Sequence, residues 1–223
     1  GDDPRRVRAG ILFELNYNMT AGHSFLPEEK LVGATAMLLS VEPEPVASQL
    51  QILLENQQVI RSVLMDIPVI YLPRLYEAEC DIARHLLQSA QLTFPEPGNI
   101  DQLMASVEAE SGLRYSVQQT LAIRQAATSG LLLVTGGPGT GKTTILKGIL
   151  SLLGQMQLKC VLAAPTGRAA KRLTEVTGEE AATIHRLLEA NIDPNTGEMF
   201  FLHDESNPLK ADAVIVDEMS MVD

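Results

Sequence analysis

Hydrophobic positions recur with a helical period through the first part of the chain. Val7, Ile11 and Leu15 illustrate the spacing, in which apolar residues return every three or four positions. The pattern predicts three helices, over residues 4–19, 31–39 and 47–54, separated by the stretches GHSFLP (22–27) and VEPEP (41–45). Asp3 before Pro4 predicts the start of the first helix, and the prolines of VEPEP cannot continue a helix interior.

Two short β-branched runs follow the three helices. They cover residues 59–65 and 68–73, and the intervening Asp66–Pro68 predicts the turn of a hairpin. Three helices followed by a hairpin is the order of a winged-helix module, which binds DNA in some proteins and only packs against other parts in others; both alternatives remain open. A long amphipathic helix follows, and the turn-rich TFPEPGN (93–99) places a domain boundary between residues 98 and 99.

The second part of the chain has a different pattern. Short, continuously apolar runs occur at LLLVT (131–135), CVLAA (160–164) and AVIVD (213–217), with helical spacing between them. Unbroken apolar strands are typical of strands that are buried on both faces, as in a parallel sheet covered by helices. The fold class is therefore α/β, preceded by a mainly helical, winged-helix-like domain.

Composition excludes several classes of protein. Apolar residues make up 45% of the 223 residues and charged residues 20%, which is typical of a globular chain. No apolar run reaches the roughly 18 residues that a membrane-spanning helix needs. Cys80 and Cys160 lack the spacing of a zinc finger or a disulfide scaffold and suit a reducing cytoplasm.

The net charge of −11 lowers the expectation of nucleic-acid binding without excluding it. Residues 1–111 carry 7 basic and 16 acidic side chains, whereas residues 112–223 carry 10 and 12. The second part is nearly neutral, so a local cationic groove remains compatible with it.

The run GGPGTGKTT (136–144) matches the phosphate-binding pattern G-x-x-x-x-G-K-[ST]. It lies between an expected strand and a helical run, which is the setting that this motif requires. Glycines let backbone N–H groups face phosphate oxygens, and the following helix adds its positive end. We expect Lys142 to reach the β- and γ-phosphates and Thr143 to bind Mg²⁺. The complete set of expected ATP-binding residues here is Gly136, Gly137, Pro138, Gly139, Thr140, Gly141, Lys142, Thr143 and Thr144.

A pair of carboxylates ends the last apolar run. Asp217 is expected to hold the magnesium ion and Glu218 to act as general base for the attacking water. The GTPase element DxxG does not occur at this place, which favours ATP as the nucleotide.

Several motifs together resemble the RecD-like DNA helicases of superfamily 1. They are YSVQQ, GGPGTGKTT, APTGRAAKRL, TIHRLL and VIVDEMSMVD, and GDDPRRVRAGI, GHSFLP and YLPRLYEAE resemble the segment ahead of the motor in stand-alone members. The resemblance implies an incomplete RecA-like domain, an ATP-dependent 5′-to-3′ helicase, single-stranded DNA as partner, and work in DNA repair and recombination. Since the sequence stops six residues beyond Asp217, we expect a second RecA-like domain in a longer protein and no unwinding by this chain alone.

The same resemblance implies roles for individual residues. Gln119 falls where the family reads the adenine edge, with Gln118 as the competing position. Contacts to single-stranded DNA fall on Pro165, Thr166, Gly167 and Arg168. Lys171 and Arg172 fit a solvated face as well as a DNA contact, and packing is favoured for His185. A non-motor adaptor, a nucleotide-dependent binding module and the helicase subunit of a nuclease-helicase complex remain as alternative functions.

Overall fold

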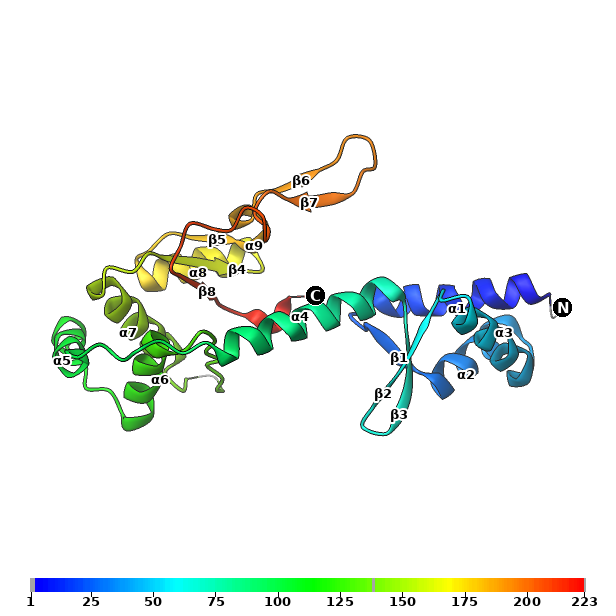
Figure 1. The fold of residues 1–223 in the computed structure, drawn as a ribbon, viewed down its shortest axis with the longest axis horizontal. Coiled ribbons are helices and arrows are strands. Elements are labelled where there is room, and N and C mark those ends of the chain that lie inside the picture. The colour runs from blue at the N-terminus through cyan, green and yellow to red at the C-terminus, as the bar shows by residue number, and fades with distance from the viewer. Residues whose placement is uncertain (1–2, 138, 223) are drawn as a thin grey trace. The chain divides into compact units, whose positions relative to one another are not determined.

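The computed structural model describes residues 3–137 and 139–222, and the chain divides into two compact units, Gly1–Gln88 and Ser89–Asp223 (Figure 1). The division falls ten residues before the boundary that the turn-rich stretch suggests. Backbone hydrogen bonds explain the difference. Phe94 donates to Thr128 O and Gly130 donates to Leu92 O, so the residues after the long helix already belong to the second unit.

The first unit consists of helices packed on a small antiparallel sheet. In chain order its elements are α1 (Pro4–Met19), β1 (Phe25–Pro27), α2 (Glu28–Leu39), α3 (Pro43–Glu55), β2 (Ile60–Leu64), β3 (Ile67–Tyr71) and α4 (Pro73–Gln91), which continues into the second unit. The strand order is β1-β3-β2. The Asp3 carboxylate accepts a hydrogen bond from Arg5 N and caps α1, as expected. The predicted order of three helices and a hairpin is confirmed.

Three local predictions in this unit need correction. The GHSFLP stretch contains strand β1, which pairs with β3 through Phe25 and Tyr71. α3 begins at Pro43, inside the expected VEPEP break, because proline fits the first turn of a helix. The hairpin turns at Met65 and Asp66, both with positive φ, and Pro68 lies within β3. Pro68 pairs with Val63 of β2, but β1 reaches only as far as Val69, so no residue of β1 lies opposite Pro68 to need its missing N–H.

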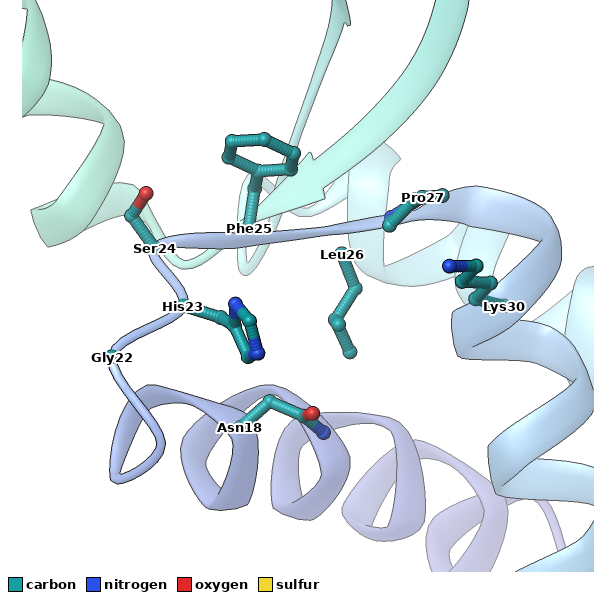
Figure 2. Close-up of a pocket in the computed structure, with 8 residues that line it drawn as sticks. All are labelled: Asn18, Gly22, His23, Ser24, Phe25, Leu26, Pro27 and Lys30. Atoms are coloured by element: carbon teal, nitrogen blue, oxygen red, sulfur yellow. The ribbon is translucent and has the colours of Figure 1, made fainter.

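The short strand β1 separates two environments. Figure 2 shows Leu26 and His23 directed toward α1, whereas Phe25 points to the other side of the strand. The Phe25 ring lies 5.2 Å from the Tyr71 ring, centroid to centroid. The hollow in Figure 2 is lined by Asn18, Gly22, His23, Ser24, Phe25, Leu26, Pro27 and Lys30. It shares no residue with the nucleotide motifs.

The second unit is an α/β domain built around a parallel sheet. Its elements are α5 (Ile100–Ser111), α6 (Val117–Thr128), α7 (Lys142–Gln155), β4 (Cys160–Ala164), α8 (Gly167–Thr177), β5 (Ala181–Thr183), α9 (Ile184–Leu187), β6 (Ala190–Ile192), β7 (Met199–Phe201), β8 (Ala213–Val216) and a 3₁₀ turn at Met219–Met221. The strand order is β5-β4-β8, and both pairs are parallel. The strands predicted at 160–164 and 213–217 are confirmed, the second ending at Val216.

The strand predicted over residues 131–135 is wrong for this structure. These residues have no assigned strand, and the Leu133 side chain is 75% exposed. The residues just before them pair with the segment after α4, through a bridge between Thr93 and Ser129. An apolar run becomes a strand only where a partner strand completes its hydrogen bonds, and sequence alone does not supply that partner.

Helices α5, α6 and α7 share one core with the sheet. Val107, Ile123 and Leu152 are fully buried in it, and Ile215 of β8 packs against the same cluster. α7 is thereby fixed to both α6 and the sheet. The position of α7 matters because the glycine loop leads directly into its first turn.

The segment between α9 and β8 contains a second hairpin, outside the parallel sheet. β6 and β7 form a separate antiparallel hairpin whose turn includes Gly197 at φ +72° (Figure 1). Asp193 stabilises the turn by accepting hydrogen bonds from Asn195 N and Thr196 N. Among the described helices, none combines the length and the hydropathy needed to span a bilayer.

Candidate nucleotide site

The glycine loop leads directly into α7. Gly139 and Gly141 have φ values of +74° and +85°, which only glycine adopts without strain. Gly141 is the N-cap of α7, so Lys142 and Thr143 are the first residues of the helix. Unbonded backbone N–H groups and the positive helix end therefore lie at the loop. Pro138, part of the expected ATP site, lies outside the described residues.

Side chains of the loop bond to the loop itself. Thr140 Oγ1 donates to Gly137 O over 2.9 Å, and Lys142 Nζ donates to Gly137 O over 2.8 Å and to Gly136 O. A Cβ on Gly136 would come within 2.6 Å of Thr140 Oγ1, so a larger residue there would displace the Thr140 side chain. The amine of Lys142 is thus held over the loop and can exchange its carbonyl partners for phosphate oxygens.

Gln119 lies against the end of the loop. A Cβ on Gly141 would come within 2.7 Å of Gln119 Nε2. A capping box at the start of α6 holds this side chain, because Ser116 N donates to Gln119 Oε1 over 3.0 Å and Gln119 N donates to Ser116 Oγ over 3.3 Å. Gln118, the competing position, is exposed. The structure therefore brings Gln119 to the glycine loop.

The acidic pair lies at the carboxyl end of the sheet. β4 and β8 pair through Ala163 and Val216, and Asp217 N donates to Ala163 O over 3.0 Å. Glu218 adopts a left-handed conformation at φ +54°, and its N–H donates to Asp217 Oδ1 over 2.9 Å. Both carboxylates are exposed. Within the described residues, no hydrogen bond or ion pair joins them to the glycine loop.

The residues expected to bind magnesium are compatible with that ion. Thr143 is exposed in the first turn of α7, and Asp217 is exposed at the sheet edge. No group of three or more potential metal ligands among His, Cys, Asp and Glu occurs in the described part of the chain. A nucleotide-bound Mg²⁺ does not need such a group, since it takes one or two protein oxygens together with phosphates and waters.

The expected DNA-contact residues follow β4 at the same edge of the sheet. Thr166 is the N-cap of α8, and its Oγ1 accepts a hydrogen bond from Ala169 N over 3.2 Å. The hydroxyl proton of Thr166 and the N–H groups of Gly167 and Arg168 remain available to an anion. Pro165 is half-buried between β4 and this helix start.

The remaining basic residues of α8 face solvent. Arg168, Lys171 and Arg172 are exposed, and Lys171 lies 4.0 Å from Glu175 in a surface ion pair. His185, on α9, is exposed, and its ring lies 6.0 Å from the Phe201 ring between centroids.

One useful signal in the sequence concerns Ser116. The pattern S-x-x-Q at 116–119 is that of a capping box, which fixes the glutamine at the third helical position. This spacing distinguishes Gln119 from Gln118 on the amino-acid sequence alone.

Comparisons with known proteins agree with the motifs. A family model described as an AAA domain matches residues 119–223. The ATP-dependent RecD2 DNA helicase of Deinococcus radiodurans is 35% identical, over 99% of this chain and 31% of that protein. The RecBCD enzyme subunit RecD of Mycobacterium tuberculosis is 31% identical, over 98% of this chain and 38% of that protein. The ATP-dependent DNA helicase dda of Enterobacteria phage T4 is 39% identical, over 40% of this chain and 21% of that protein.

These similarities cover both units of the chain. The resemblance to RecD-like helicases, expected from the motifs, is confirmed along nearly its whole length. The chain itself spans about a third of the length of the RecD2 and RecD relatives.

Proposed function

We propose that this chain, a relative of the RecD and RecD2 helicases, carries the nucleotide site of an ATP-dependent DNA helicase. The observation that carries the proposal is the contact of Gln119 with the glycine loop at Gly141, because it unites two separate ATP motifs in one place. The 5′-to-3′ polarity rests on the family resemblance alone.

In this proposal the glycine loop holds the triphosphate of ATP. Backbone N–H groups at the start of α7 bind phosphate oxygens, and Lys142 exchanges its bonds to Gly136 and Gly137 for the β- and γ-phosphates. Thr143 and Asp217 would hold Mg²⁺, which neutralises charge on the phosphates. Glu218 takes the proton of the attacking water as general base.

Gln119 then recognises the base. Its Oε1 already accepts one hydrogen bond from Ser116 N, and an amide oxygen has a second lone pair for the adenine amino group. Its Nε2 can donate to a ring nitrogen of the same base. Guanine has an oxygen where adenine has the amino group, so the pairing with Oε1 would become repulsive. This chemistry favours ATP over GTP.

Single-stranded DNA is the proposed partner of the sheet edge after β4. A phosphate there would accept hydrogen bonds from Thr166 Oγ1 and from the N–H groups of Gly167 and Arg168. Pro165 sets the direction in which the chain enters α8. The exposed guanidinium of Arg168 adds attraction for the DNA backbone.

The complete motor needs more than this chain. We propose that a second RecA-like domain provides the other wall of the ATP site, and the greater length of the relatives supports this part. Closure of two such domains on ATP would change the grip on DNA. A cytoplasmic location belongs to the same proposal and is compatible with two free cysteines, Cys80 and Cys160.

The test compares two substitutions in the complete protein. Asp217→Asn should weaken binding of Mg·ATP, whereas Glu218→Gln should retain binding and abolish DNA-stimulated hydrolysis. Unwinding by the unsubstituted complete protein is then measured on duplexes with a 5′ or a 3′ single-stranded tail. Only the 5′-tailed duplex should be opened. Undiminished hydrolysis by both variants would contradict the proposed chemistry.

A second candidate function has one observation in its favour. The acidic charge of the first part of the chain suits docking to a basic protein partner. As an adaptor, the protein would bind nucleotide without DNA-stimulated turnover. In the nuclease-helicase alternative, the complete protein would require partner subunits for unwinding, and assay of the purified protein alone separates this case from the stand-alone motor.

A further inference from the structure

Gly148 is a point of close approach between α7 and α6. It is buried, seven residues after Gly141 on the same helix. A Cβ on Gly148 would lie 2.4 Å from Ile123 Cδ1 and 3.1 Å from the Tyr115 hydroxyl. Carbon atoms in contact are normally about 3.5–4.0 Å apart, so a methyl group here must displace the buried Ile123 side chain or one of the helices.

The two residues nearest to a Cβ added at Gly148 flank Gln119 in the sequence. Ile123 lies four positions after Gln119 on α6, so the two share one helical face, whereas Tyr115 lies just before the N-cap residue Ser116. Ile123 is fully buried, and Tyr115 N donates to Glu108 Oε1 over 3.0 Å. The contact at Gly148 therefore sets the position of the face that carries Gln119.

A second contact holds α6 from another direction. Arg124 donates to Asp101 Oδ1 over 2.7 Å and to Glu96 Oε1 over 3.0 Å, which ties α6 to α5 and to the segment before it. These exposed ion pairs oppose a shift of α6 that would accept extra volume at Gly148. Such volume must displace the Ile123 side chain, shift Gln119 relative to Gly141 or break the ion pairs of Arg124.

We infer that Gly148 is a specificity-determining positioning residue. Because glycine has no side chain, α6 can pack closely on α7, and this close packing places the Gln119 amide to recognise adenine rather than guanine. The inference rests on the proposed role of Gln119 in base recognition. The atoms nearest to a Cβ added at Gly148 belong to Ile123 and Tyr115 and not to the glycine loop. Its effect passes through Ile123 and the backbone of α6.

The test measures base selectivity in the 223-residue chain. A fluorescent ATP analogue labelled on the ribose is displaced by ATP and by GTP, and the ratio of the two affinities is compared among variants. Gly148→Ala should reduce the preference for ATP by about 10- to 100-fold, the range expected for a misplacement of roughly 1 Å. Gly154→Ala is the matched control, because it lies on α7 with no atom within 4 Å of its added Cβ.

A compensating substitution distinguishes positioning from general damage. Ile123→Val removes the Cδ1 atom that the new methyl group would meet, so Gly148→Ala with Ile123→Val should recover the preference for ATP. General loss of structure would weaken ATP and GTP alike and leave their ratio unchanged. If Gly148→Ala alone does not fold, the double variant is used for the test. A ratio of ATP to GTP affinity in the double variant that differs from that of the original chain overturns the inference.

The outcomes separate this inference from the proposed function. No displacement of the analogue by ATP in the original chain would overturn both. A clear preference for ATP in the original chain that persists in Gly148→Ala would overturn the role of Gly148 alone. A reduced preference in Gly148→Ala, unchanged in Gly154→Ala and restored by Ile123→Val, supports it.

Discussion

The side-chain nitrogen of Gln119 lies so close to Gly141 that a Cβ at that glycine would come within 2.7 Å of it. Gly141 also has φ +85° and caps α7. Two constraints therefore favour glycine at position 141: the positive φ of its backbone and the nearby side chain of a residue on a different helix. Because both constraints act on one residue, the glycine loop is coupled to the proposed base-recognition residue.

Substitution of two glycines separates these demands. Gly141→Ala should weaken ATP binding and also reduce the preference for ATP over GTP, because it strains the backbone and displaces Gln119. Gly139→Ala should weaken both nucleotides equally, since its φ is +74° but its added Cβ has no atom within 4 Å. Left-handed strain costs about 1 kcal/mol, or roughly fivefold in affinity if it opposes binding. Nucleotide competition measures both effects, and equal ratios in the two variants would contradict the coupling.

Thr35 should respond to replacement by valine with a gain in stability. Its side chain is fully buried in α2, and Oγ1 has no hydrogen-bond partner among the described residues. Valine keeps the shape and removes the unsatisfied hydroxyl, so Thr35→Val should stabilise the first unit by about 1 kcal/mol in urea unfolding. Thr20→Val is the control, and it should give no gain in stability because Thr20 Oγ1 is exposed and donates to Tyr17 O. A loss of stability in Thr35→Val would show that the hydroxyl has a partner in solution.

Tyr71 makes the stability of the first unit dependent on alkaline pH. Burial, with help from its hydrogen bond to Glu79, raises the pKa of Tyr71 to about 12. Its pKa in the unfolded chain is about 10, so the unfolded state ionises first and stability is lost as the pH rises from about 10 toward 12. Tyr71→Phe should make this part of the decline shallower.

The pH dependence is measured by urea unfolding at about pH 9 and about pH 11. The control is Tyr17→Phe, since Tyr17 is 63% exposed and lies outside the core. The same decline between the two pH values in Tyr71→Phe and in the original chain would contradict the assignment.

Much of this architecture is predictable from patterns that local chemistry imposes. The runs at 160–164 and 213–217 became β4 and β8 because continuous apolar strands are stable only when both faces are covered. The glycine loop could be placed because an apolar run, the glycines, a lysine and a helix follow one another directly. These features are encoded within a few neighbouring residues.

Features that depend on distant partners were not predictable in the same way. β1 has only three residues, one of them Pro27, and exists because β3 offers it an edge. Residues 131–135 have the composition of a strand, yet their neighbours pair with the segment after α4. From the sequence alone, Gly148 is only an unfavourable residue inside a helix. The position of Ile123 explains it, because Ile123 leaves little space for a side chain there.

The central claim is that the loop from Gly136 to Thr144 binds the triphosphate of ATP. The most direct measurement is the equilibrium affinity of this chain for Mg·ATP after Lys142→Ala, compared with Lys147→Ala. Both lysines are exposed on α7 and carry the same charge, but only Lys142 bonds to the loop carbonyls. Loss of a charged hydrogen bond to phosphate should weaken binding in Lys142→Ala by about 10- to 100-fold and leave Lys147→Ala close to the original chain. Equal affinities in all three proteins would contradict the account.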